Sequence, residues 1–174
     1  MPTIGVAVAI PEPWATELQD YRTSVGDVMA ATIPTHITLV PPTEVADDLG
    51  DVERHLAAAA TRVAPFEVHL RGTGTFRPVS PVVFVNLVEG ISQCEQLAAA
   101  VRSGPLDVVL DYPYHPHVTV AHHLDDERLD RAFDELADFD CRFAVDSFHL
   151  YVHDDQHGWR ASRDFALKPR LRVG

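Results

Sequence analysis

Cysteine, basic residues and long apolar runs are all scarce in this chain of 174 residues. Its two cysteines, Cys94 and Cys141, form neither a CxxC pair nor a disulfide framework, and both fall in apolar patterns where we expect them to be buried. No stretch approaches the roughly 20 apolar residues of a membrane span, and the N-terminus lacks the basic region of a signal peptide. We therefore expect a cytoplasmic protein with no membrane partner.

The charge balance limits the kind of partner that the protein can have. Fourteen basic residues stand against 26 acidic ones, which gives a formal net charge of −12. An extended nucleic-acid surface needs clustered lysines and arginines, so we expect none here. A small phosphorylated ligand, or one RNA end held in a local pocket, is still compatible with this charge.

Apolar periodicity predicts alternating strands and helices over the whole chain. Capping patterns place helix starts at Ser92, with Glu95 three residues later, and at Asp125. Pro41 and Pro42 are expected to end the second strand. The expected strands span 4–10, 33–40, 66–76, 82–88, 117–121, 143–152 and 159–167, and the four helices lie between them. Each half of the chain thus has the same order of elements, and we expect one bilobal domain over residues 1–174.

The feature most informative about function is a repeated His-aliphatic-Thr-aliphatic motif. It occurs as His36-Ile37-Thr38-Leu39 and again as His117-Val118-Thr119-Val120. The two copies stand 81 residues apart, close to half the chain, as an internal duplication would place them. Residues i and i+2 of a strand project from the same face, so each histidine points the same way as its threonine. If the two halves face each other, two imidazoles and two hydroxyls converge on one cleft.

Such a cleft has the chemistry to cleave a phosphodiester. Histidine has an ordinary pKa of about 6.5, so one imidazole can be neutral and accept a proton while the other donates one. The hydroxyls of Thr38 and Thr119 can donate to phosphate oxygens. A positioned acid or base is worth on the order of 10²- to 10⁴-fold in rate, and no metal or cofactor is required.

With these motifs, the chain resembles the two-histidine phosphoesterase superfamily, which includes 2′-5′ RNA ligases and cyclic nucleotide phosphodiesterases. The lead-in Tyr114-His115-Pro116-His117 and the ending Phe148-His149-Leu150-Tyr151, followed by Gly158-Trp159, are similar too. The resemblance implies an α+β fold with two antiparallel-rich sheets, flanked by helices around a central cleft. It also implies metal-independent chemistry on 2′,3′-cyclic phosphates or related phosphodiesters.

Two departures from the family pattern bear on the phosphate site. Val40-Pro41-Pro42 replaces a Phe-Leu-Gly type of sequence after the first motif. His122-His123 stands where many members place an arginine, so a cationic partner is either lost or supplied by Arg77 or Arg71.

Other candidate residues are weaker. Tyr114 and Phe76 are aromatic and could stack on a base, although core packing is an equal explanation. Together with Arg77 they are the expected substrate-lining residues. A metal cluster of His115, His117, His122 and His123 is disfavoured, because strand alternation places His122 on the face opposite the other three.

The sequence therefore predicts a monomeric, metal-independent phosphodiesterase that opens the 2′,3′-cyclic phosphate of a nucleotide or short RNA end. His36 and His117 are the expected catalytic residues, and Thr38 and Thr119 the expected phosphate ligands. The alternatives are a 2′-5′ RNA ligase, in which a ribose hydroxyl is the nucleophile at the same site, a non-catalytic protein that binds nucleotide phosphates, and a metal-dependent hydrolase.

Overall fold

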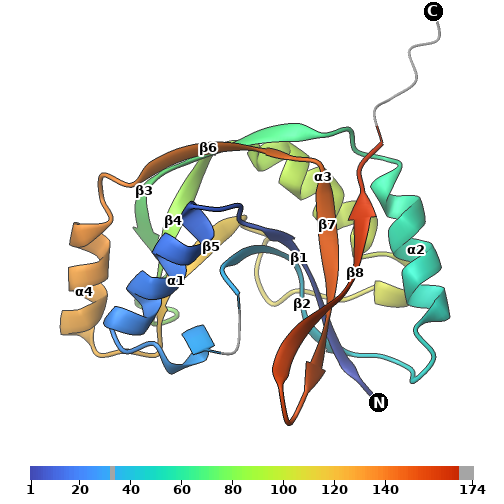
Figure 1. The fold of residues 1–174 in the computed structure, drawn as a ribbon, viewed down its shortest axis with the longest axis horizontal. Coiled ribbons are helices and arrows are strands. Elements are labelled where there is room, and N and C mark those ends of the chain that lie inside the picture. The colour runs from blue at the N-terminus through green and yellow to red at the C-terminus, as the bar shows by residue number, and fades with distance from the viewer. Residues whose placement is uncertain (32–33, 169–174) are drawn as a thin grey trace, which may run out of the picture.

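The computed structural model describes residues 1–31 and 34–168, which form an antiparallel sheet with four α-helices (Figure 1). Two short 3-10 segments, Val28–Ala31 and Gly104–Leu106, connect the larger elements. The helices are α1 (Trp14–Ser24), α2 (Gly50–Ala60), α3 (Ile91–Val101) and α4 (Asp126–Glu135). The strands are β1 (Thr3–Ala9), β2 (His36–Glu44), β3 (Phe66–Thr75), β4 (Val82–Glu89), β5 (His117–His122), β6 (Asp140–Val145), β7 (Ser147–Asp154) and β8 (Gly158–Ala166).

The eight strands form one sheet in the order β6-β3-β4-β5-β2-β1-β7-β8, where two sheets were expected. The two halves of this sheet meet where β2 and β5 pair in antiparallel orientation, with Ile37 opposite Val118. All the other neighbouring strands pair over longer stretches, so the sheet curls around this short seam (Figure 1). The two expected sheets are therefore four-stranded halves of a single curled sheet.

The last strands of the chain are distributed differently from the prediction. A single strand was expected over 143–152, but the structure breaks it at Asp146 into β6 and β7. β6 pairs with β3 at one end of the sheet, whereas β7 pairs with β1 in the other half. β3 comes from the first half of the sequence but pairs with β4, in the half of the sheet that also contains β5 and β6. Each half of the sheet thus contains strands from both halves of the sequence.

β2 continues through Pro41 and Pro42 to Glu44, although these prolines were expected to end it. β1 pairs with β2 at Val40 and again at Thr43, and the register shift between these positions leaves both prolines outside the paired positions. A proline cannot donate a ladder hydrogen bond, so it is tolerated where the ladder is interrupted.

The helices pack on the sheet through an apolar core. α1 contacts β5, α3 contacts β2, and α4 contacts β3, β4 and β5. Asp125 caps α4 as expected, because its carboxylate accepts from the backbone N–H of Arg128 at 2.9 Å. The expected cap at Ser92 is wrong, since α3 begins at Ile91 after Gly90, whose positive φ of 93° suits glycine. Both cysteines are buried, as expected.

Candidate active site

The two His-x-Thr motifs meet at the seam of the sheet. In an antiparallel pair centred on Ile37 and Val118, His36 lies opposite Thr119, and Thr38 lies opposite His117. All four side chains project from one face of the sheet, because they flank the central pair on both strands. Ile37 and Val118 point to the other face and are fully buried. The seam therefore brings two imidazoles and two hydroxyls together.

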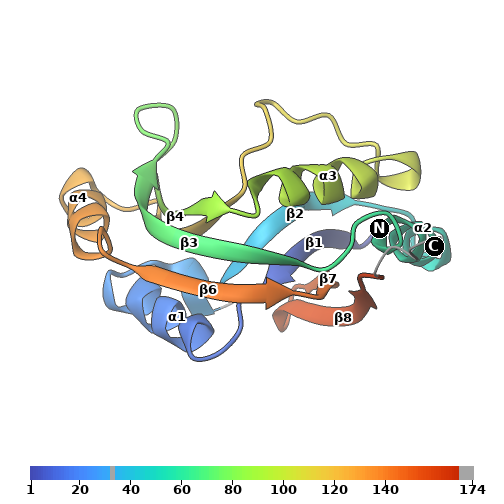
Figure 2. The same cartoon turned by 90° about the horizontal axis from the view of Figure 1, so that it is seen from above.

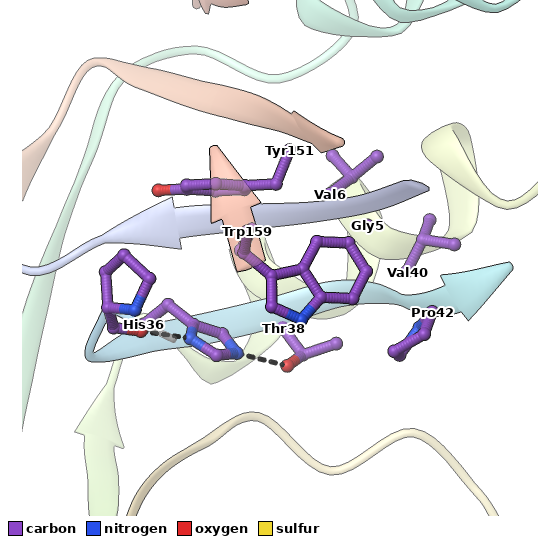
Figure 3. A pocket seen from close by; sticks show the side chains of 10 residues that line it. Gly5, Val6, His36, Thr38, Val40, Pro42, Tyr151 and Trp159 are labelled. Carbon is purple, nitrogen blue, oxygen red and sulfur yellow. Dashed lines mark hydrogen bonds between the residues drawn. The ribbon is translucent and has the colours of Figure 1, made fainter. Parts of the chain in front are cut away.

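His36 is held by hydrogen bonds on both ring nitrogens (Figure 3). Its Nδ1–H donates to the carbonyl of Pro34 at 2.6 Å, and its Nε2 lies 3.1 Å from Oγ1 of Thr38. The carbonyl can only accept, so Nδ1 carries the proton and Nε2 holds the lone pair of the neutral ring. Nε2 is therefore the nitrogen available to exchange a proton.

His117 is oriented in the same way. Its Nδ1–H donates to the carbonyl of His115 at 2.7 Å, again the residue two positions earlier. The rings of Phe76 and Phe84 pack against it with centroids at 4.9 and 5.1 Å. Both imidazoles thus present Nε2 as the reactive nitrogen.

Burial keeps both imidazoles neutral to a lower pH than usual. Desolvation lowers the pKa of His36, and the nearby charge of Arg22 lowers it further. Desolvation also lowers the pKa of His117 to about 4, with smaller contributions from the rings of His115 and His36. That His36 lowers the pKa of His117 agrees with the closeness of the two rings at the seam.

Two hollows extend from the seam and share Thr38 in their walls. The smaller, about 150 Å³, is lined by His36 and reaches Tyr151 and Trp159 (Figure 3). The larger, about 630 Å³, is lined by His117 and Thr119 and continues between the loops around residues 79–80 and 110–114. These two loops rise on the same side of the sheet (Figure 2). A phosphate at the threonines would have room for a substituent in either direction.

The structure places Phe76 and Tyr114 at the larger hollow but gives each a packing role as well. The ring of Phe76 packs against Phe84 in a tilted arrangement, with ring centroids 4.5 Å apart, and contacts His117 edge-on. The hydroxyl of Tyr114 donates to the backbone carbonyl of Thr38 at 2.7 Å, which ties the segment before β5 to β2. Tyr114 thus supports the position of Thr38.

Arg77 lies away from the cleft, contrary to its expected role as a lining residue. Its guanidinium donates to Asp130 at 2.8 Å and lies 3.6 Å from Asp126, both on α4. It lines a separate surface hollow with these carboxylates. Arg71, the other cation considered, is exposed on β3 opposite Asp140. Neither arginine is among the residues that line the two hollows beside the motifs.

Among residues 1–31 and 34–168, no three histidine, cysteine or carboxylate side chains are grouped so as to hold a metal ion. Within the same residues, no helix has the length and apolarity needed to cross a membrane.

The motifs and the fold agree with comparisons to known proteins. The model of the family described as "2′-5′ RNA ligase superfamily" matches residues 10–157. The chain belongs to this superfamily. The resemblance to two-histidine phosphoesterases, inferred from the motifs, is thereby confirmed.

Known relatives match this chain over nearly its whole length. A candidate phosphoesterase of Bacillus licheniformis is 32% identical over 157 residues, which cover 87% of this chain and 92% of the relative. The solved structure of Escherichia coli LigT in apo form matches with a TM-score of 0.66 at 21% identity, covering 97% of this chain and 99% of LigT. TT0787 of Thermus thermophilus matches with a TM-score of 0.69 at 23% identity, covering 98% and 100%. At such identities the structural matches establish the fold.

A β-bulge in β5 explains why His122 lies on a different face of the sheet from the one that the sequence predicted. β4 pairs with Thr119 and next with Ala121, which leaves Val120 as an extra residue. The extra residue reverses the alternation, so His122 lines the same hollow as His117 and Thr119. Strand alternation had placed it on the opposite face. β2 carries the corresponding irregularity at Leu39, 81 residues earlier.

Trp159 and Tyr151 are further cleft residues absent from the sequence-based candidates. They come from β8 and β7, and both line the hollow beside His36 (Figure 3). The alternation of aromatic residues along β7 was the signal available in the sequence. Because a single strand was expected over 143–152, the position of β7 beside β1 was not predicted.

Proposed function

We propose that this superfamily member is a metal-independent phosphodiesterase that opens the 2′,3′-cyclic phosphate of a nucleotide or short RNA end. The observation that carries the proposal is the pairing of Ile37 with Val118, which places two Nε2 atoms and two hydroxyls on one face. Solved structures of LigT in complex with 3′-AMP and with ATP support a nucleotide as the ligand class.

The proposed reaction uses one imidazole as a base and the other as an acid. Water attacks phosphorus while its proton passes to the Nε2 of the neutral histidine. The bond from phosphorus to one ribose oxygen breaks, and the protonated histidine donates its proton to that oxygen. Thr38 and Thr119 donate to the phosphate oxygens on which charge develops. The expected product is a 2′-phosphate, and the two histidines exchange roles in the reverse direction.

Ligation of 2′-5′ bonds is the second candidate, and the two hollows favour it. They diverge from Thr38, one beside His36 and one beside His117. A nucleoside on each side of a shared phosphate is the arrangement that a ligation product needs.

The decisive test is a panel of 2′,3′-cyclic nucleotides and oligonucleotide ends, with products resolved as 2′- or 3′-phosphates. We expect ring opening to the 2′-phosphate, unchanged after exhaustive chelation. Tight binding of a cyclic nucleotide with no product after long incubation would establish a non-catalytic binder. Activity lost on chelation and restored by a metal would establish a metal-dependent hydrolase.

The activity should be greatest on the acid side of neutrality. Among the described residues that line the two hollows, none is a lysine or arginine, so a protonated imidazole has to supply the positive charge. The pKa values of both histidines lie below the ordinary 6.5. As the pH rises, each imidazole therefore loses its proton at a lower pH than an ordinary histidine does. We expect kcat/KM to peak below pH 6.5 and to fall towards pH 8.

The pH profile of kcat should shift in the opposite direction. A bound anionic phosphate favours the imidazolium, so the pKa of the histidine that stays protonated rises in the complex. The alkaline limb of kcat is therefore expected at higher pH than that of kcat/KM, because kcat/KM reports the free protein. Initial rates from pH 4.5 to 8.5 measure both limbs. A kcat/KM that stays flat to pH 8 would contradict the assignment.

A further inference from the structure

β1 crosses the cleft face between strands with larger side chains, and two of its lining residues, Gly5 and Ala7, are small. Ala7 lies opposite Thr38 of β2, and Gly5 lies opposite Tyr151 of β7. Both line the hollow beside His36. A Cβ atom on Gly5 would lie 3.6 Å from Cζ3 of Trp159, so the indole lies close to the bare backbone there. The floor of the hollow is therefore formed by backbone at Gly5, on which the edge of the indole packs, and by the methyl group of Ala7.

The corresponding place in the other half of the sheet is filled. There β4 puts Phe84 opposite Thr119, where β1 puts Ala7 opposite Thr38. Phe84 is 4% exposed and packs against the tilted ring of Phe76. The two sides of the seam consequently differ at the level of the sheet, with an aromatic side chain opposite Thr119 and a methyl group opposite Thr38.

The walls of this hollow suit a flat apolar ring. Trp159 and Tyr151 supply aromatic surface, and Val6, Val40 and Pro42 supply aliphatic surface (Figure 3). Its volume of about 150 Å³ is comparable to that of an apolar cavity that takes up benzene. The hollow opens on His36 and Thr38, so a ring bound in it is next to a phosphate held by Thr38.

We infer that this hollow, between Trp159, Tyr151 and the floor formed by Gly5 and Ala7, is the subsite for the nucleobase of the bound nucleotide. The inference rests on the proposed function for the identity of the phosphate ligand. It goes beyond that function by specifying where the base binds: towards β7 and β8, next to His36 and away from His117.

The same lining indicates that the subsite does not distinguish one base from another. Beyond His36 and Thr38, which face the phosphate, Tyr151 and Trp159 are the only described lining residues whose side chains carry a polar atom. A lining without amides or carboxylates has few groups to read the hydrogen-bonding edge of a base. Stacking on aromatic rings is available to every base, because each has a π-face.

The test compares nucleoside 2′,3′-cyclic phosphates with methyl riboside 2,3-cyclic phosphate, which has the same reacting group but no base. For the unmodified protein we expect kcat/KM to be on the order of 10- to 100-fold higher with a base, and purine and pyrimidine substrates to agree within about 5-fold. Trp159→Ala should remove most of this preference, and Trp159→Phe, which keeps an aromatic ring, should retain it.

The base-free substrate controls for damage to the fold. If Trp159→Ala lowers kcat/KM for both substrates alike, Trp159 is only structural and the subsite is refuted. Equal turnover of both substrates by the unmodified protein also refutes it. A preference for one base above about 50-fold would overturn the base-tolerant part of the inference.

A binding arm separates this inference from the proposed function. Calorimetry with 2′-AMP and with methyl riboside 2-phosphate measures the contribution of the base without any turnover. Tighter binding of 2′-AMP that disappears in Trp159→Ala supports the subsite even if no cyclic phosphate is hydrolysed. Equal affinities refute the subsite even if hydrolysis is observed.

Discussion

Replacing either motif histidine by alanine is expected to lower kcat/KM for 2′,3′-cyclic nucleotides by about 10²- to 10⁴-fold, which is the worth of a positioned acid or base. His36→Ala removes the Nε2 that lies 3.1 Å from the Thr38 hydroxyl, and His117→Ala removes the ring packed on Phe76. The kcat/KM of the double variant should be little lower than that of the less active single variant, because the two groups act in one step. Initial rates with the cyclic nucleotide panel measure these losses.

The matched control is His55→Ala. The imidazole of His55 bonds to the carbonyl of Val101 through Nε2 at 2.8 Å and does not line either hollow at the seam. Its loss should leave kcat/KM within about 3-fold of the unmodified protein, a margin far below the effect of a positioned acid or base. Thermal unfolding of all three variants checks that they are folded. Turnover at the unmodified level in a folded His36→Ala or His117→Ala protein would refute the mechanism.

The orientation of the four motif side chains could be predicted from sequence because it depends only on local geometry. Strand residues two apart share a face whatever the strand pairs with, so His36 with Thr38 and His117 with Thr119 follow from the spacing. The closeness of the two pairs is a tertiary property. It depends on the antiparallel pairing at Ile37 and Val118, and nothing local in either motif specifies that partner.

The residues whose positions were predicted wrongly share a physical cause. Each depends on a feature of the fold that the alternation of side chains along a strand does not reveal. One extra residue at Val120 reverses the face of everything after it, and His122 moves into the cleft. The break at Asp146 sends β6 and β7 to different halves of the sheet, and no local pattern reveals the destination. Arg77 was expected to line the cleft as a cationic partner of the phosphate, but its partners on α4, Asp126 and Asp130, are 49 and 53 residues away in sequence and adjacent only in the fold.

A buried ion pair at the end of α1 is expected to dominate the stability of the α1 segment. Arg22 and Asp27 have side chains only 4% and 1% exposed, and the guanidinium donates to Oδ2 of Asp27 at 3.1 and 2.9 Å. Oδ1 of the same carboxylate accepts from the backbone N–H of Met29 at 3.1 Å. The pair thus joins the end of α1 to the 3-10 segment that follows. Its charges also influence the pKa values of His36 and His122.

Asp27→Ala should therefore lower the free energy of unfolding by about 3–5 kcal/mol, because it leaves the Arg22 guanidinium buried without its counter-charge. That is a large part of the 5–15 kcal/mol, roughly, of a typical domain. The double variant Arg22→Met/Asp27→Leu removes both charges and should recover most of the loss, since an apolar pair has no ionic desolvation cost. Urea unfolding of the two variants measures both quantities. If Asp27→Ala costs less than about 1 kcal/mol, the value of an exposed pair, water reaches the guanidinium and the pair does not hold the end of α1 to the 3-10 segment as a buried pair.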